Sequence, residues 1–314
     1  MPKHHNLKGS LILCITALIW GLAFVAQSGA AKLIPPFVCN SLRSLIAAAA
    51  LFLFFKVTNR AKEPFFPKEP VKKKQVLKIA LICGCLFTLA TNIQQAGFAL
   101  YPNGVASEAR AGFLTALYVV IVPILSVFFG KRIHLILIPC VLITVAGVYL
   151  LCAAGGFHGF YAGDVLMLLC AFGFSMHIMA VDRFVAVTGG VRLAIMQFTI
   201  CGVLSGILSL LFEKPIFTNL LAAIPQILYL GLFSSGIAYT LQIVGQKYAE
   251  PAIASLVMSL ESVFAALGGW LLAGNALSPA EVCGCVLVFA AIVLAQLPEL
   301  LESRKEKNKG RCRT

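Results

Sequence analysis

Long runs of apolar residues, separated by short polar segments, extend along almost the whole chain. A transmembrane helix needs roughly 20 mostly apolar residues, because each residue advances the helix by about 1.5 Å and the hydrocarbon core is about 30 Å thick. Ten runs meet or approach this length, and each predicts a membrane-spanning helix. Their limits are 9–29, 37–56, 76–99, 105–129, 133–151, 161–181, 192–212, 223–246, 251–273 and 279–297.

The first run has a second interpretation, because Lys3 and Lys8 precede it and small residues follow from Ser28 to Ala31. This is the layout of a cleaved signal peptide, but the apolar stretch exceeds the roughly 7–15 residues of such peptides. We therefore expect ten spans rather than nine. The longest hydrophilic segment, 56–75, is too short to form a soluble domain with its own core.

Composition agrees with this pattern, since 60% of the residues are hydrophobic, 12% are charged and the mean hydropathy is +0.94. A soluble domain has about a quarter charged residues, so lipid must surround much of this chain. The sequence contains no phosphate-binding Gly-Lys-Ser/Thr loop, no HExxH pair and no cysteine spacing typical of zinc sites. We therefore expect no enzyme, no cofactor and no metal site.

Lys and Arg are distributed very unequally over the two sides that ten spans define. Twenty-one lie on the side of the N-terminus and two, Lys32 and Lys214, on the other, while Arg43 and Arg110 fall inside apolar runs. Cytoplasmic loops carry such an excess, so we expect a multi-pass protein of the cytoplasmic cell membrane with both termini in the cytoplasm. The basic segments, including a tail over 299–314, then face anionic lipid, and nucleic-acid binding is not expected.

The chain also resembles itself at offsets of 154 and 147 residues. The matching pairs are Gly9 with Gly163, Trp20 with Phe174, Arg43 with Gln197, Asn92 with Tyr239, Gln95 with Gln242 and Tyr101 with Tyr248. Either Tyr118 or Leu114 matches Glu261. The halves 1–153 and 160–298 then hold five spans each, and an odd number inverts the second half. We predict an all-α polytopic membrane protein with ten transmembrane helices as two inverted five-helix repeats; a chance likeness of apolar helices is the alternative.

Polar side chains inside the apolar runs are the candidates for function, because a charge at the membrane centre costs roughly 2.5–3.5 kcal/mol on insertion scales. Such residues face the protein interior and mark a pathway or a buried pair. The candidates for lining a substrate cavity are Trp20, Arg43, Asn92, Gln95, Tyr239, Gln242 and Glu261. Arg43 is also a candidate for a structural ion pair with Glu108, and Arg110 is expected to reach the headgroup region.

Glu261 is an isolated acid near the middle of the run 251–273. At about 100° per residue, it points away from a leucine-rich face that we expect to contact lipid. That face consists of Leu256, Leu260, Val263, Leu267 and Leu271. Two interpretations stay open: Glu261 binds a cationic group or a proton during transport, or it is a protonated or hydrogen-bonded structural group. Burial disfavours its charged form in both cases.

Five segments carry a resemblance to a known family. They are "LIWGLAFVAQ" (Leu18–Gln27), "SLRSLIAAAALFLF" (Ser41–Phe54), "AGFLTALYVVIVPILSVFFGKRI" (Ala111–Ile133), "GDVLMLLCAFGFSMHIM" (Gly163–Met179) and "LESVFAALGGWLLAG" (Leu260–Gly274). Over nearly the whole chain they resemble the EamA-type family of the drug/metabolite transporter superfamily, and Glu261 matches the Glu of its second signature. The chain departs from the family at Ser262, where Pro is common, and at Lys131 and Asn275, where acids are common.

The resemblance implies two inverted repeats around a central cavity and secondary transport of small metabolites, commonly amino acids or related compounds, without ATP. We expect this chain to move such a substrate across the cytoplasmic membrane by alternating access, in the direction of export, with Glu261 as the candidate for proton coupling. A membrane-embedded enzyme and a non-transporting membrane sensor are the alternatives. The expected partners are a small-molecule substrate and membrane lipid, and a homodimer is left open.

Overall fold

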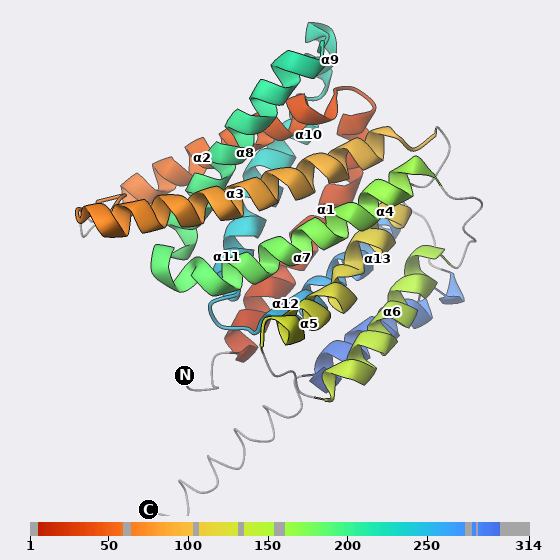
Figure 1. The fold of residues 1–314 in the computed structure, drawn as a ribbon. Helices are drawn as coiled ribbons and strands as arrows, with labels where there is room; N and C mark the ends of the chain where they lie inside the picture. Colours follow the sequence, from red (N-terminus) through yellow and green to blue (C-terminus); the bar gives the residue numbers. More distant parts are fainter. Residues whose placement is uncertain are drawn as a thin grey trace, which may run out of the picture.

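Helices form all the regular secondary structure in the residues that a computed structural model describes, namely 6–58, 64–102, 107–130, 135–153, 161–273, 278–280 and 282–295. The tail predicted over 299–314 lies outside them. In chain order (Figure 1) the helices are α1 (Asn6–Ala31), α2 (Pro36–Thr58), α3 (Pro70–Ala99), α4 (Ser107–Ala116), α5 (Tyr118–Phe128), α6 (Leu137–Ala153), α7 (Ala162–Thr188), α8 (Gly190–Phe212), α9 (Phe217–Ala222), α10 (Ile224–Leu228), η2 (Tyr229–Tyr239), α11 (Thr240–Gly245), α12 (Pro251–Met258) and α13 (Leu260–Ala273), followed by a helix over Val282–Ala295.

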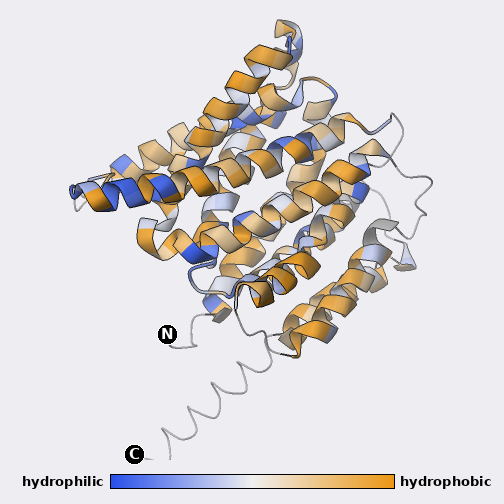
Figure 2. Cartoon of the chain, viewed as in Figure 1, coloured by the Kyte–Doolittle hydropathy of each residue, from blue (hydrophilic) through white to orange (hydrophobic). Residues whose placement is uncertain are grey.

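Seven helices among the described residues are long and apolar enough to cross a membrane. Three shorter apolar helices accompany them, at Leu137–Leu150, Pro251–Ala265 and Val282–Ala295. In Figure 2 hydrophobic residues cover most of the ribbon, and hydrophilic residues gather at helix ends such as the start of α3. Each of the ten predicted runs thus contains a helix, and the fold is that of an all-helical membrane protein.

The exterior of the bundle is apolar, and many polar groups lie inside it. Phe128 and Leu210 are 83% and 87% exposed, whereas Asn40, Gln95 and Gln197 are fully buried. In a bilayer, lipid tails solvate exposed apolar side chains, while polar groups must find partners inside the protein. The distribution therefore fits a lipid environment around the helices.

The two halves of the chain pack against each other through two similar glycine contacts. A Cβ atom added to Gly163 of α7 would lie 2.8 Å from the carbonyl oxygen of Gly97 in α3. A Cβ atom added to Gly9 of α1 would lie 3.0 Å from the carbonyl oxygen of Gly245 in α11. Gly9 and Gly163 are a pair that the offset of 154 predicted, so the contacts support a duplicated repeat.

Two helices break within one residue of equivalent positions. The α4–α5 segment is interrupted at Leu117 and the α12–α13 segment at Ser259. At each break a backbone N–H bonds to the carbonyl three residues before it, Val120 to Leu117 at 3.0 Å and Ser262 to Ser259 at 3.2 Å. This tighter 3₁₀-type bond replaces the usual α-helical one, and its recurrence in both halves is a second sign of duplication.

Several boundaries differ from the expected ones. The sixth run was expected to close near Asp182, but α7 continues to Thr188 and ends at Gly189, whose φ of 78° suits glycine. The eighth run contains a π-helical segment, η2, over Tyr229–Tyr239. An amphipathic pattern does not reveal such a segment, because the wider turn depends on hydrogen bonds rather than on hydrophobicity.

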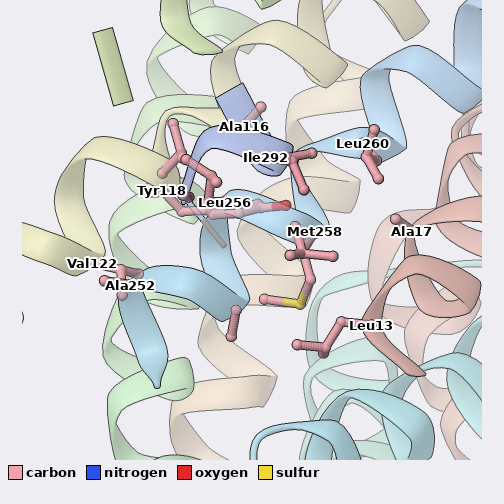
Figure 3. Close-up of a cluster of buried hydrophobic side chains, with 14 of the residues drawn as sticks. Leu13, Ala17, Ala116, Tyr118, Val122, Ala252, Leu256, Met258, Leu260 and Ile292 are labelled. Carbon is pink, nitrogen blue, oxygen red and sulfur yellow. The ribbon is translucent and has the colours of Figure 1, made fainter. Parts of the chain in front are cut away.

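The predicted lipid-facing side of the run 251–273 is wrong for Leu256, Leu260 and Val263, while the side chain of Leu271 lies outside the described residues. Leu256, Leu260 and Val263 are at most 4% exposed and belong to a buried cluster with residues of α1, α5 and the helix Val282–Ala295. Figure 3 shows Leu256 and Leu260 within this cluster. The segment lies among other helices, and a helical wheel cannot distinguish a leucine face that contacts lipid from one that contacts an apolar helix.

Candidate functional site

A cavity with a volume of about 40 Å³, enough for a few water molecules, lies between the two halves of the chain. Among the described residues, each half contributes seven to the lining. Those of the first half are Trp20, Phe24, Gln27, Arg43, Gln94, Thr115 and Tyr118, and those of the second are Phe174, Ile178, Ser234, Tyr239, Gln242, Met258 and Glu261. Five predicted residues therefore meet here: Trp20, Arg43, Tyr239, Gln242 and Glu261.

Many of these lining residues occupy equivalent positions of the repeat. Trp20 with Phe174 and Phe24 with Ile178 are both 154 residues apart, and Thr115 with Met258 and Tyr118 with Glu261 are both 143 apart. Of the two matches considered for Glu261, the structure thus favours Tyr118 over Leu114. A cavity lined by equivalent residues from both halves lies where the two repeats face each other.

Glu261 lies in the first turn of α13, directly after the break at Ser259, and is 3% exposed. The hydroxyl of Tyr118, the first residue of α5, donates a hydrogen bond to its Oε1 atom at 3.0 Å. An acid in the first turn of a helix also meets the positive end of the helix dipole. Both members of this pair follow a helix break, so the two breaks place the carboxylate of Glu261 on the cavity wall.

Arg43 of α2 is a buried cation, 2% exposed, on the wall of the same cavity. Its Nη1 atom donates to Oε1 of Gln27 over a long 3.4 Å, and its Nε atom has no hydrogen-bond partner among the described residues. None of the described carboxylates forms an ion pair with it. Arg43 is therefore a charge in the membrane interior whose neighbours within the protein only partly compensate it.

The predicted ion pair between Arg43 and Glu108 is absent among the described residues, because Arg43 turns toward Gln27. Arg110 was expected to reach the headgroup region. Arg110 is 7% exposed and forms an ion pair with Asp164 at the start of α7. The two-residue spacing from Glu108 turns the side chain of Arg110 elsewhere, and it contacts the start of α7.

Two other predicted residues do not line the cavity. Asn92 donates to Ser205 of α8 at 2.8 Å and accepts from Asn40 of α2 at 2.9 Å. Gln95 is fully buried and donates to the carbonyl oxygen of Gln27 at 3.1 Å. Both side chains lie where α3 packs against other helices. The side chain of the neighbouring Gln94 points about 100° away around the helix, and it lines the cavity instead.

Aromatic rings form a second wall. The ring centroids of Trp20 and Tyr239 are 4.5 Å apart, and those of Phe87 and Tyr239 are 4.7 Å apart. The indole Nε1 of Trp20 donates to the carbonyl oxygen of Ser234 at 3.3 Å, within the π-helical segment η2. A π-helical turn widens the backbone locally, so η2 presents this carbonyl and the ring of Tyr239 together to α1.

Comparison with known proteins identifies the family. The model of the EamA-like transporter family matches residues 7–153 and, a second time, residues 161–297. The chain belongs to the EamA-like transporter family. One family model of the drug/metabolite transporter superfamily matches the chain twice, so the chain contains a duplicated domain. This agrees with the contacts between the two halves described above.

Two individual relatives extend over most of this EamA-like chain. A protein of Archaeoglobus fulgidus described as an uncharacterised transporter is 29% identical over 297 residues, which are 93% of this chain and 87% of that protein. One protein crystal structure is similar with a TM-score of 0.72 at 22% identity, covering 93% of this chain and 97% of that chain. The second likeness shows a shared fold.

Several lining residues of this EamA-like protein were missed by sequence reasoning. They are Phe24, Gln27, Gln94, Thr115, Tyr118, Phe174, Ile178, Ser234 and Met258. The offset of 154 carried the signal for Phe174, because it pairs with Trp20. The amides of Gln27 and Gln94 were visible as polar residues in apolar runs, but nothing in the sequence chose between Gln94 and Gln95.

Gly21 allows α1 to approach α13 at this site. A Cβ atom there would lie 2.7 Å from the backbone oxygen of Glu261 and 2.7 Å from the Cβ of Phe264. We expect Gly21→Ala to lower the unfolding free energy by about 1–3 kcal/mol, the usual cost of overpacking. Gly112→Ala is the matched control, because no atom lies within 4 Å of its added Cβ; thermal unfolding in detergent compares the two, and equal losses would contradict the tight α1–α13 contact.

Proposed function

We propose that this EamA-like protein is a secondary transporter that moves a small metabolite, an amino acid or a related compound, through the central cavity by alternating access. The supporting observation is that both halves line the cavity with equivalent residues. Buried polar atoms without partners, Nε of Arg43 and Oε1 of Gln242, belong to the same lining. Because unpaired buried polar atoms cost free energy, a bound substrate that pairs with them would be stabilised.

The direction of the helices supports ten crossings arranged as inverted repeats. The ends of α1 and α3 lie together, because Gln95 bonds to Gln27 and the rings of Phe24 and Phe98 are 6.3 Å apart. The start of α7 contacts the end of α3 at Gly97. Helix α7 therefore runs opposite to α1, its equivalent in the repeat, as an inverted repeat requires.

The size of the cavity supports an occluded state of a transport cycle. A volume of about 40 Å³ holds a few water molecules, so entry of a metabolite requires the halves to move apart. The breaks at Leu117 and Ser259 lie beside Tyr118 and Glu261. We propose that these breaks absorb the rocking of one half against the other, because discontinuous helices at a repeat interface form the binding sites of many transporters.

Glu261 is the proposed site of proton coupling, and outward transport is the proposed direction in the cell. The hydrogen bond from Tyr118 fixes the position of this carboxylate in the cavity. A proton bound to Glu261 would therefore weaken or strengthen substrate binding directly. Export follows from the family resemblance rather than from the geometry. The protein is not proposed to be an enzyme, because it belongs to a family of transporters.

The proposed orientation places both termini in the cytoplasm. Basic residues near the starts of α1 and α8 contact aromatic rings at one end of the bundle: Lys8 over Tyr248 at 5.0 Å and Arg192 over Phe55 at 5.5 Å. This agrees with the positive-inside distribution of the sequence. A C-terminal fusion to green fluorescent protein should fluoresce, and a C-terminal alkaline phosphatase should be inactive; the reverse result would overturn the orientation.

Transport is tested with purified protein in liposomes. A panel of the twenty amino acids and small aromatic acids is first scored by thermal shift, and each stabilising compound is then measured as a radiolabel in counterflow. We expect saturable counterflow of at least one stabilising compound, absent from empty liposomes. Stabilisation without flux of any compound would overturn the transport proposal and favour a non-transporting sensor.

A further inference from the structure

We propose that Arg43 is the binding site for a single carboxylate group of the substrate, and that the aromatic wall of the cavity holds an apolar body attached to that carboxylate. The proposal deepens the proposed function, on which the idea of a transported substrate rests. The binding step can be measured without transport, so the two can fail separately.

The charge of Arg43 is the first step. A guanidinium remains protonated in proteins, and a buried cation without an opposing charge is expensive in a membrane. Within the described residues, the only hydrogen bond of Arg43 is the 3.4 Å contact to Gln27. A structural role would predict an acid beside it, as Arg110 has Asp164. A cation on a cavity wall without such an acid is the arrangement of an anion-binding site.

The free edge of the guanidinium is the second step. Gln27 contacts Nη1, and Nε has no partner. The edge formed by Nε and Nη2 is therefore available, and its two parallel N–H groups match the two oxygens of a carboxylate. Lysine would offer a point charge without this geometry.

The other lining residues select the rest of the ligand. The rings of Trp20 and Tyr239 lie 4.5 Å apart, and Phe24 and Phe174 line the same space. These surfaces favour an apolar or aromatic body. A phosphate monoester is disfavoured, because it carries a charge of about −1.5 to −2, while the described lining residues supply one cation and include Glu261.

The test uses Trp20 as a reporter. The chain has two tryptophans, so Trp270→Phe leaves Trp20, in the cavity wall, as the only one. Its fluorescence is titrated in detergent with three matched probes, 3-phenylpropionate, 3-phenylpropan-1-ol and 3-phenylpropylamine, and with phenyl phosphate. We expect saturable quenching by 3-phenylpropionate, with a Kd about ten- to one-hundred-fold lower than that of the alcohol, the range for a hydrogen bond to a charged group.

Three variants in the same background assign the preference to Arg43. In Arg43→Gln the preference for the acid over the alcohol should disappear while alcohol binding persists, which also shows that the variant is folded. Arg43→Lys should keep a reduced preference, because it keeps the charge and loses the fork. Arg183→Gln is the matched control, because Arg183 is exposed, and it should bind all probes like the parent.

The results that overturn the proposal are specific. Equal or tighter binding of the alcohol, the amine or phenyl phosphate by the parent protein would exclude a carboxylate site, and so would the absence of saturable quenching by 3-phenylpropionate. An unchanged preference in Arg43→Gln would place the site elsewhere. Binding of the acid without flux in liposomes would overturn the transport proposal alone, while counterflow of an uncharged compound that Arg43→Gln leaves unchanged would overturn the carboxylate site alone.

Discussion

Glu261→Gln should uncouple transport from a proton gradient while leaving substrate exchange intact. A pH gradient of one unit stores about 1.4 kcal/mol per proton, so one coupled proton concentrates a substrate about ten-fold at steady state. Glutamine has nearly the same shape as glutamate but cannot titrate, so the accumulation ratio of the variant should fall to about one. The measurement is radiolabel accumulation in liposomes with an imposed pH gradient, beside counterflow without a gradient.

Two further variants separate titration from structure. Glu250→Gln makes the same change at an exposed residue directly before α12 and should leave the accumulation ratio unchanged. Tyr118→Phe removes the 3.0 Å hydrogen bond to Glu261 but leaves a titratable carboxyl, so the rate should fall while accumulation persists. Ten-fold accumulation by Glu261→Gln would show that its carboxyl is a structural group, the other interpretation that the sequence left open.

The charged members of the cavity were predictable because of a general constraint. Arg43 and Glu261 stand inside apolar runs, where a charge is tolerated only toward the protein interior, and both line the cavity. Asn92 obeys the same constraint and yet lies elsewhere, because Ser205 and Asn40 satisfy it at a contact between α3, α8 and α2. Burial was therefore predictable from hydrophobicity, whereas the choice between a cavity and a helix contact depends on tertiary neighbours.

The helices themselves were predictable from the lengths of the apolar runs, but their surroundings were not. Leu256 and Leu260 form a face as apolar as any that contacts lipid, and they contact other helices instead. Tyr118 is a second residue whose surroundings could not be predicted from the sequence. Its hydroxyl reaches Glu261 because α5 begins at that residue after the break at Leu117, and the sequence contains no proline or glycine at that point to indicate the break.

Asp164→Asn should destabilise the protein more than any substitution in the cavity. Asp164 is 1% exposed and joins three segments: Arg110 of α4 donates from Nε at 3.0 Å, Tyr101 after α3 donates its hydroxyl at 2.8 Å, and the backbone N–H of Tyr161 donates at 2.9 Å. Removing the charge deprives the buried guanidinium of Arg110 of its ion pair with Asp164. Breaking such a pair typically costs about 3–5 kcal/mol, which denaturant unfolding in detergent measures.

The matched control is the surface ion pair of Lys72 with Glu69, 3.0 Å long with both side chains more than 60% exposed. Glu69→Gln should cost no more than about 1 kcal/mol, because exposed pairs contribute little. A double-mutant cycle with Arg110→Gln then isolates the coupling, since the second substitution should cost much less once Asp164 is already Asn. Additive losses, or a loss in Asp164→Asn no larger than in Glu69→Gln, would show that this pair does not stabilise the junction of α3, α4 and α7. A large coupling energy would show that an ion pair joins the two halves at this end of the bundle. The first repeat has no such pair at the equivalent position of α1, because Ser10, which corresponds to Asp164, is uncharged.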